Sequence, residues 1–318
     1  MNGIKTHEMS VTRRRFLRQV VMGAAMGFSG VFPWGAFARG RDADVVLTLL
    51  HTNDQHSRIE PFPKDGTRYA GLGGFAQRAS LLKRLRQQTE HVLLLDAGDV
   101  FQGTPYFNLF EGEVEIAGMN AMGYDACTIG NHDFDAGIEV LAERMRQSQF
   151  AWLNCNYRID DTPLEGLVKR YIITERGPLK IGITGVGIDP EGLVPAHLCV
   201  GVRYDDPIAS LDEVAGQLKR EEKCHLVVVL SHLGYRYRRG DRISDVALAK
   251  ESRYIDLIIG GHTHTFMDDI DIVQNRCGQP VYIHQVGWAG IRLGRIDIAF
   301  DDKLRLRGVR RAHYCVGA

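Results

Sequence analysis

Long apolar runs are missing from this sequence of 318 residues. The most apolar stretch, residues 20–32, is shorter than the ~20 residues that a membrane-spanning helix needs. Basic and acidic residues number 39 each, so no excess of positive charge is present to bind nucleic acid. The six cysteines are scattered without a C-x-x-C pair, so the sequence indicates no particular disulfide among them. What is left is a globular composition, 44% hydrophobic and 25% charged, with enough residues for a substantial core.

The first forty residues differ from the rest. A twin arginine, Arg13 and Arg14, stands in the block T-R-R-R-F-L-R, and a short apolar run and Ala36-Phe37-Ala38 follow. A basic segment, an apolar segment and a small-x-small cleavage site are typical of a signal peptide, and the block resembles a twin-arginine export signal. We predict a signal peptide over residues 1–38, a periplasmic location and no stable membrane insertion after cleavage. An uncleaved membrane anchor is the alternative.

The predicted mature part, residues 39–318, carries 34 basic and 38 acidic side chains, which again gives no basis for nucleic-acid binding. Short apolar runs rich in β-branched residues predict buried strands at residues 45–50, 91–98, 126–130, 151–155, 180–186, 225–231 and 255–261. Helical patterns fall between several of them, at residues 73–88, 137–147, 206–222 and 243–254. Near the C-terminus, three strand-like segments follow with little room for helices, at residues 280–287, 292–300 and 303–311. The pattern predicts an α/β fold with a core over residues 44–311, finished by a run of adjacent strands.

Polar side chains follow five of the predicted strands, which is where an α/β protein usually builds its site. One histidine in such a place is most often structural, but five strand ends on one sheet edge predict a function. None of the five carries a serine elbow, a phosphate-binding loop or a catalytic type of cysteine. The polar residues at these ends are Asp54, His56, Asp99, Asn131, His132, Asp133, Asp135, His232, His262 and His264.

The residue types suit a pair of divalent cations. Carboxylate, imidazole and amide groups together favour zinc, manganese, iron or cobalt over calcium, which prefers oxygen alone. In an extended segment, residues i and i+2 share a face, so the D-x-H pair Asp54 and His56 can reach one ion, as can His262 and His264.

The ordered set D-x-H, G-D-x-x-x-G, G-N-H-D, S-H-L-G and G-H-x-H resembles the metallophosphatase domain of the 5′-nucleotidase family, among the calcineurin-like dinuclear metallophosphoesterases. The blocks LTLLHTNDQHS, DAGDVFQGTP, IGNHDFDAG, IDLIIGGHTH and VGWAGIRLGRIDIAF stand in family order over roughly residues 45–300. The resemblance implies a four-layered α/β/β/α sandwich with the metals at the strand ends. It assigns residues 39–318 to this metallophosphatase domain.

The resemblance also implies a role for each polar residue. Asp54, His56 and His264 would hold one metal; Asn131, His232 and His262 would hold the other; Asp99 would bridge the two. His132 and Asp135 match the family's catalytic dyad, and Asp133 would support their loop. We therefore expect hydrolysis of phosphomonoesters, nucleotides included, to an alcohol and phosphate, by water activated between two divalent cations. His132 would protonate the leaving group, and Asp135 would orient it.

Full-length 5′-nucleotidases carry a second, C-terminal domain that supplies arginines and aromatic residues for the substrate. This sequence ends shortly after the metallophosphatase domain. Two hypotheses address specificity: a separate partner chain resembling that domain, or the basic loop at residues 235–242, which follows His232 and whose arginines suit phosphate. A solvated turn is the simpler interpretation of the loop.

Two other functions stay open. Exported sulfur-oxidation thiohydrolases share this metal domain, although they normally keep the C-terminal domain. The chain could also be a subunit of a split 5′-nucleotidase with little activity alone, but the His132 and Asp135 pair argues against a purely binding role. Trp288, in VGWAGIRLG, could contact substrate, and His51 could support a ligand from behind.

Overall fold

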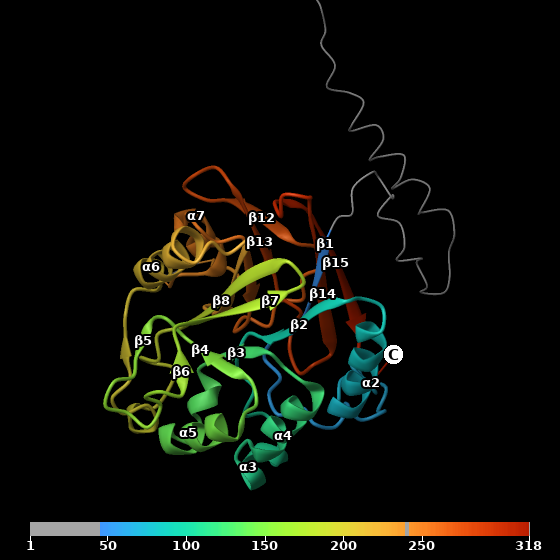
Figure 1. Ribbon diagram of the computed structural model, residues 1–318. Coiled ribbons are helices and arrows are strands. Elements are labelled where there is room, and N and C mark those ends of the chain that lie inside the picture. The colour runs from blue at the N-terminus through green and yellow to red at the C-terminus, as the bar shows by residue number, and fades with distance from the viewer. Residues whose placement is uncertain (1–44, 239–241, 318) are drawn as a thin grey trace, which may run out of the picture. The chain divides into compact units, whose positions relative to one another are not determined.

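The computed structural model describes residues 45–238 and 242–317. The predicted signal peptide lies outside these residues. The described part folds into two large β-sheets with helices outside them (Figure 1). No helix in these two ranges is both long and apolar enough to cross a lipid bilayer.

The first sheet has seven strands in the order β15-β14-β1-β2-β3-β4-β6. Strands β1 to β6 in this sheet run parallel, while β14 and β15 pair antiparallel at its edge. The strands are β1 (Val45–Thr52), β2 (His91–Asp96), β3 (Ala126–Thr128), β4 (Ala151–Leu153), β6 (Val168–Lys169), β14 (Arg292–Phe300) and β15 (Leu306–Cys315).

The second sheet has six strands in the order β12-β13-β11-β10-β8-β7, of which the four central ones are parallel. They are β7 (Tyr171–Arg176), β8 (Leu179–Gly187), β10 (Leu226–His232), β11 (Leu257–Gly260), β12 (Asp271–Gln274) and β13 (Pro280–His284). A small antiparallel pair, β5 (Tyr157–Arg158) and β9 (Arg203–Tyr204), stands apart from both large sheets.

Alternation along each strand separates the core into layers. Leu47 and Leu49 of β1 pack with Val228 of β10 and Ile259 of β11 between the two sheets. Leu50 points to the opposite face and packs under the helices of the first sheet, because successive strand residues face opposite sides. The hydrophobic layers therefore make an α/β/β/α sandwich, and the predicted fold class is confirmed.

Helices α2 to α5 cover the first sheet, while α6 and α7 cover the second, on the opposite side of the pair (Figure 1). Their bounds are α2 (Phe75–Arg86), α3 (Pro105–Phe110), α4 (Glu113–Met122), α5 (Ile138–Gln147), α6 (Pro207–Arg220) and α7 (Asp245–Glu251). Two 3₁₀ turns, η1 (His132–Phe134) and η2 (Ala196–Leu198), lie in loops. Of these helices α2, α5, α6 and α7 match the helical sequence patterns, whereas α3 and α4 were not predicted.

Two expectations about the sheets are wrong. The C-terminal strands are not a run of neighbours: β13 pairs with β11 and β12 in the second sheet, while β14 and β15 belong to the first. The five strand ends do not lie on one sheet edge either, because β1, β2 and β3 are in the first sheet and β10 and β11 are in the second. Strand β15 also extends to Cys315, beyond the predicted core end at residue 311.

Candidate metal centre

Loops from both sheets are tied together at the ends of the five strands. The Asp54 N–H donates to the Gly98 carbonyl at 2.9 Å, which joins the loops after β1 and β2. The His262 N–H, in the loop after β11, lies 2.9 Å and 3.1 Å from the two oxygens of Asp54. Asp54 therefore connects the first sheet with the second at the point where the predicted ligands gather.

The backbone at this point is unusual. Five predicted ligands have φ between 48° and 67°, a region that L-residues rarely adopt: Asp54, His56, Asp99, His262 and His264. Conformations of this kind cost about 1–3 kcal/mol each and persist where the surrounding structure holds them, often at functional sites. The strain is concentrated in the loops that the sequence marks as ligating.

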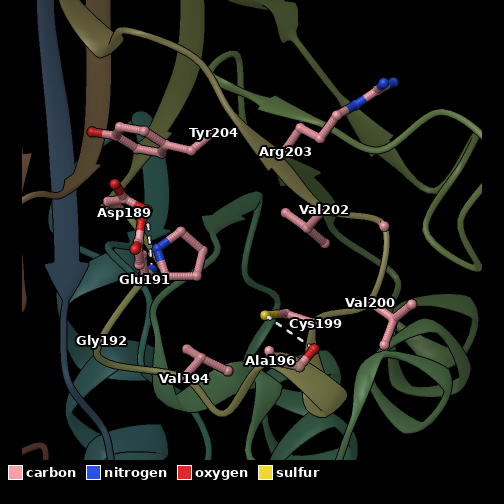
Figure 2. A pocket seen from close by; sticks show the side chains of 12 residues that line it. Asp189, Glu191, Gly192, Val194, Ala196, Cys199, Val200, Val202, Arg203 and Tyr204 are labelled. Carbon is pink, nitrogen blue, oxygen red and sulfur yellow. Dashed lines mark hydrogen bonds between the residues drawn. The ribbon is translucent and has the colours of Figure 1, made fainter.

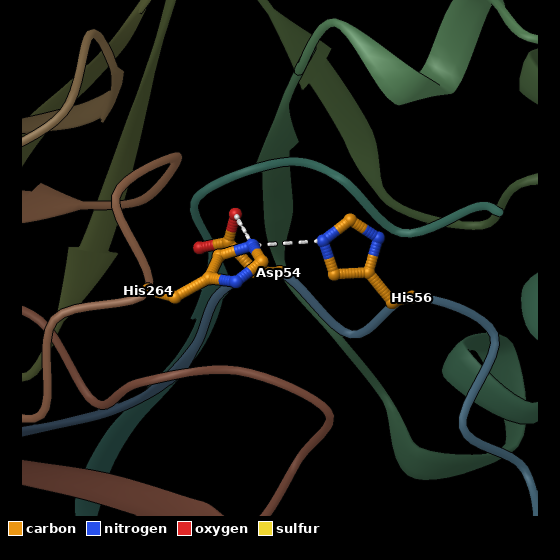
Figure 3. Close-up of side chains that lie close together, drawn as sticks. All are labelled: Asp54, His56 and His264. Atoms are coloured by element: carbon orange, nitrogen blue, oxygen red, sulfur yellow. Dashed lines mark hydrogen bonds and ion pairs between the residues drawn. The ribbon is translucent and has the colours of Figure 1, made fainter. Parts of the chain in front are cut away.

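Asp54, His56 and His264 form one possible metal-binding group, with one ligating atom from each within 4.8 Å of the others. His264 Nε2 lies 2.9 Å from His56 Nε2 and 3.3 Å from Asp54 Oδ1, and Figure 3 shows the three side chains converging. Asn53 fixes the carboxylate, because its Nδ2 donates to Asp54 Oδ2 at 2.5 Å. Asn53 was missed from the sequence, since its role depends on where the chain turns after β1.

Asp99, His232 and His262 form the second group within the same limit. Asp99 Oδ2 lies 3.0 Å from His232 Nε2 and 3.9 Å from His56 Nε2, so this carboxylate faces both groups. Asn131 joins the second group, with its Oδ1 at 2.9 Å from His262 Nδ1. The structure therefore brings together the seven predicted ligands in the two sets that the family resemblance implies.

The donor atoms fit a cation. His232 is fully buried and its Nδ1 faces the Ala97 carbonyl at 2.7 Å, while its Nε2 faces the Asp99 carboxylate at 3.0 Å without the geometry of a good hydrogen bond. A ligating histidine commonly binds through one nitrogen and holds a carbonyl with the other. Burial lowers the pKa of His232, but the carboxylates of Asp99 and Asp54 outweigh it and raise that pKa to about 10. The site thus attracts positive charge, which a divalent cation supplies as well as a proton does.

Two neighbouring histidines favour the neutral form that metal ligands need. Burial lowers the pKa of His56, against the opposing effect of the Asp99 and Asp54 carboxylates. Burial and the adjacent His232 lower the pKa of His262 to about 4, and the positive charge of Arg242 acts in the same direction. Both shifts favour the unprotonated imidazole.

Glycines in the motifs allow this close approach. A Cβ on Gly130 would overlap the Asp99 carboxylate, and a Cβ on Gly261 would lie 2.7 Å from the Ala97 carbonyl oxygen and 2.9 Å from His232 Nδ1. The glycines of G-N-H-D and G-H-T-H thus have a packing reason that the sequence alone does not reveal.

His132 and Asp135 lie beside the two groups on the turn η1. His132 Nδ1 lies 2.8 Å from Asp135 Oδ2, and the His132 backbone N–H donates to Asp99 Oδ1 at 2.8 Å. The hydrogen bond with Asp135 raises the pKa of His132, against the opposing effect of partial burial. The ring of His132 lies 5.4 Å from that of His56 between centroids, so this imidazole stands next to the first group.

Asp133 holds the surrounding loops. Its buried carboxylate accepts four backbone N–H groups, from Gly130 at 2.7 Å, Val100 at 2.9 Å, Asp99 at 3.1 Å and Phe101 at 3.3 Å. One side chain therefore fixes the loop that carries Asp99 to the loop that carries Asn131 and His132.

The remaining candidates lie as follows. Trp288 stacks on the ring of His264, with centroids 5.7 Å apart and planes at 8°, so it forms a wall of the first group. His51 faces His284 at 2.8 Å in the interior and no hydrogen bond joins it to a predicted ligand in the described residues. In the basic loop, Arg236 pairs with Asp271 at 3.2 Å, while Arg239 lies outside the described residues.

The sequence model of the calcineurin-like phosphoesterase family matches residues 47–266, which include all the residues of both groups. The chain belongs to the calcineurin-like phosphoesterases. Within this family, the chain is related to the 5′-nucleotidases, as predicted. It is a metal-dependent phosphoesterase, and its two His/Asp groups fit a dinuclear centre.

Three relatives show in more detail which proteins this calcineurin-like phosphoesterase is similar to. The snake venom 5′-nucleotidase of Gloydius brevicauda is 32% identical over 277 residues, which are 81% of this chain and 46% of that protein. The trifunctional nucleotide phosphoesterase YfkN of Bacillus subtilis is 30% identical over 289 residues, 81% of this chain and 18% of that protein. A 5′-nucleotidase precursor from Thermus thermophilus has a solved structure with a TM-score of 0.77 and 30% identity, over 86% of this chain and 55% of that chain. The chain thus spans about half, or less, of the length of these relatives.

Proposed function

We propose that this chain is an exported phosphomonoesterase of the 5′-nucleotidase type, which hydrolyses phosphomonoesters, nucleotides among them, to an alcohol and inorganic phosphate. The observation that carries the proposal is the meeting of two possible metal-binding groups with a hydrogen-bonded His132–Asp135 pair. A site that only binds metal has no need of a protonated histidine held beside it.

The proposed ligands come from loops of both sheets. Asp54, His56 and His264 would hold one divalent cation, and Asn131, His232 and His262 would hold the other, with Asp99 placed between the two groups. Two such cations, when bound, lower the pKa of a water molecule and hold the phosphate oxygens. The chain contributes ligand atoms that are mostly buried, and Asp54 and Asp99 each accept a backbone N–H as well.

The His132–Asp135 pair acts on the leaving group. His132 in its protonated form stabilises the negative charge that develops on the leaving oxygen, and then donates a proton to it. Asp135 accepts a hydrogen bond from His132 Nδ1 and raises the pKa of His132, which favours the acid form. The product alcohol leaves neutral, and no covalent bond to the protein is formed.

Nucleotides are the substrates best supported, because the relatives at 30–32% identity are a 5′-nucleotidase and a nucleotide phosphoesterase. Export is proposed from the twin-arginine block, and a separate partner chain stays a prediction. Changing Arg13 and Arg14 to Lys tests the export: the double variant should accumulate in the cytoplasm, whereas equal export of both forms would contradict it.

The function is tested by phosphate release from the purified chain with Mn²⁺, Zn²⁺ or Co²⁺. Substrates are nucleoside mono- and diphosphates, 2′,3′-cyclic nucleotides, sugar phosphates and an aryl phosphate. Turnover of nucleotides supports the proposal as stated. Turnover of the aryl phosphate alone would retain the hydrolytic centre and assign specificity to a partner chain. No release with both metals bound would contradict the proposal and favour the thiohydrolase or subunit alternative.

A further inference from the structure

A pair of adjoining cavities lies next to the metal centre, and the proposed mechanism leaves both without a role. The larger measures about 810 Å³ and the smaller about 520 Å³. Asp189 and Tyr204 line both of them, so these two side chains form the boundary between the cavities. Each volume is in the range of small-molecule sites.

Residues next to the lining of the larger cavity pack near the turn that carries His132 and Asp135. Its wall includes Ala196 of η2, and Leu198 at the end of η2 packs near Gly137, where a Cβ would be 3.9 Å from Leu198 Cδ2. Gly137 comes two residues after Asp135. Leu198 and Tyr204 also pack against the same hydrophobic cluster as Phe134 of η1.

The ring of Tyr157 lies near both the larger cavity and the turn that carries His132. It lies 6.2 Å from the ring of Phe134 and 6.3 Å from that of Tyr204, between centroids. Its hydroxyl donates to the carbonyl of Ile188, the residue before Asp189. Tyr157 therefore packs near both the cavity wall and the turn that carries His132.

The smaller cavity begins one residue beyond a proposed ligand. His232 at the end of β10 is in register with Gly187 at the end of β8, and the next residues, Leu233 and Ile188, both line this cavity. Arg242 lines it as well, and its positive charge also acts on His262. The smaller cavity thus begins beside the ends of β8 and β10, next in sequence to the proposed ligand His232.

The lining has the chemistry of a nucleoside site. Asp189 Oδ1 accepts the Glu191 N–H at 3.0 Å, and the Asp189 carboxylate has no cationic partner among the described residues. A carboxylate in this position can accept hydrogen bonds from vicinal ribose hydroxyls, as acidic residues do in dinucleotide-binding folds. Figure 2 shows Asp189 and Tyr204 on one side of the larger cavity and Val202 and Cys199 on the other, so an aromatic face opposes apolar side chains.

The charged side chains in the lining further limit the chemical class of the ligand. Asp189 and Glu191 line the larger cavity, while Arg203, its basic residue, extends away from the space (Figure 2). In the larger cavity the carboxylates favour a neutral group rich in hydroxyl and amino donors and repel a second phosphate, whereas Arg242 supplies a positive charge in the smaller cavity. The leaving group of a nucleoside monophosphate is neutral, and that of a nucleoside diphosphate is not.

We propose that the cavities around Asp189 and Tyr204 bind the nucleoside of a nucleoside 5′-monophosphate, so that this domain selects the leaving group with its own residues. Asp189 accepts the ribose hydroxyls, and Tyr204 packs against the base. The inference rests on the proposed phosphomonoesterase function, and it makes nucleoside monophosphates better substrates than diphosphates.

The test compares kcat/KM for adenosine 5′-monophosphate with kcat/KM for 4-nitrophenyl phosphate, whose leaving group has no ribose. Asp189→Asn should lower the ratio about tenfold or more, because it removes a charged hydrogen-bond acceptor. Tyr204→Ala should lower it as well, while Tyr204→Phe keeps the ring and should keep the ratio. Asp302→Asn is the matched control, since Asp302 is an exposed carboxylate in the turn between β14 and β15.

Ratios within twofold of wild type in both Asp189→Asn and Tyr204→Ala would overturn the inference. Hydrolysis of 4-nitrophenyl phosphate without hydrolysis of the nucleotide would overturn it too, while leaving the proposed function intact. If neither substrate is hydrolysed, the proposed function fails, and titration calorimetry with adenosine then tests the cavities alone. Binding that weakens in Asp189→Asn but not in Asp302→Asn supports the inference, and no binding to wild type overturns it.

Discussion

Asp133 gives the sharpest prediction about how the metal centre is held. Its carboxylate accepts four backbone N–H groups from two loops, and all four donors are fixed by the loops that carry Asp99, Asn131 and His132. In Asp133→Ala these donors lose their acceptor in a buried place. At about 1 kcal/mol for each donor, the free energy of unfolding should fall by about 4 kcal/mol.

Asp133→Asn separates the loss of charge from the loss of hydrogen bonds. One oxygen remains, so the variant keeps either the pair from Val100 and Phe101 or the pair from Asp99 and Gly130. The expected cost is about half that of the alanine variant. Burial and the nearby Asp99 raise the pKa of Asp133, against the effect of the N–H donors, so the comparison is best made at pH 8, where the carboxylate is ionised.

Urea unfolding of the metal-free chain measures both costs, and the midpoint of thermal unfolding should fall by on the order of 10 °C in the alanine variant. Affinity for the second metal should weaken as well, because the loops no longer hold Asp99 and Asn131 together. An Asp133→Ala chain within 1 kcal/mol of wild type, with unchanged metal affinity, would refute the reasoning. Asp302→Asn serves again as the surface control.

Three further predictions concern the proposed chemistry. His132→Ala should keep both metals and lose about 10²–10⁴-fold in kcat, measured by phosphate release and metal analysis; near wild-type turnover would remove its role as general acid. Asp135→Asn should shift the alkaline limb of the pH–rate profile to lower pH, because Asp135 raises the pKa of His132; an unchanged limb would contradict that. Asp99→Ala should lose both metals, and chelation should lower the stability of wild type, by about 2.7 kcal/mol per site relative to metal at a hundredfold excess over Kd. A stability that does not respond to chelator would count against ligands from both sheets sharing one centre.

The site could be predicted from the sequence because its signals are local. Each proposed ligand follows a buried strand within a few residues, and the strands are near-continuous apolar runs that are easily recognised. The pairing of the strands was not accessible in the same way. Leu49 of β1 lies opposite Ile296 of β14, and the sequence of neither segment identifies the other as its pairing partner.

The helices after β2 show a second limit. Ile116, Met119 and Met122 of α4 are buried at helical spacing, but the helix follows a glycine and the short α3 in a segment that also reads as a loop. Its place is decided by packing under the first sheet, which overrides local propensity.

The cavity residues show a third limit. Asp189 follows β8 as the ligands follow their strands, but the D-P-E segment that contains it has no histidine beside the carboxylates. Tyr204 reaches the same cavity from β9, after the turn η2. Only the fold brings these two side chains together, so no spacing in the sequence predicts that they line one cavity.

Titration of the metal-free chain with Mn²⁺, followed by phosphate release from an aryl phosphate, tests the dinuclear phosphomonoesterase most directly. Activity should rise to a plateau at two equivalents of metal per chain, because Asp99 and its neighbours form two groups that share one substrate site. A plateau at one equivalent, or two bound equivalents without any phosphate release, would contradict the account.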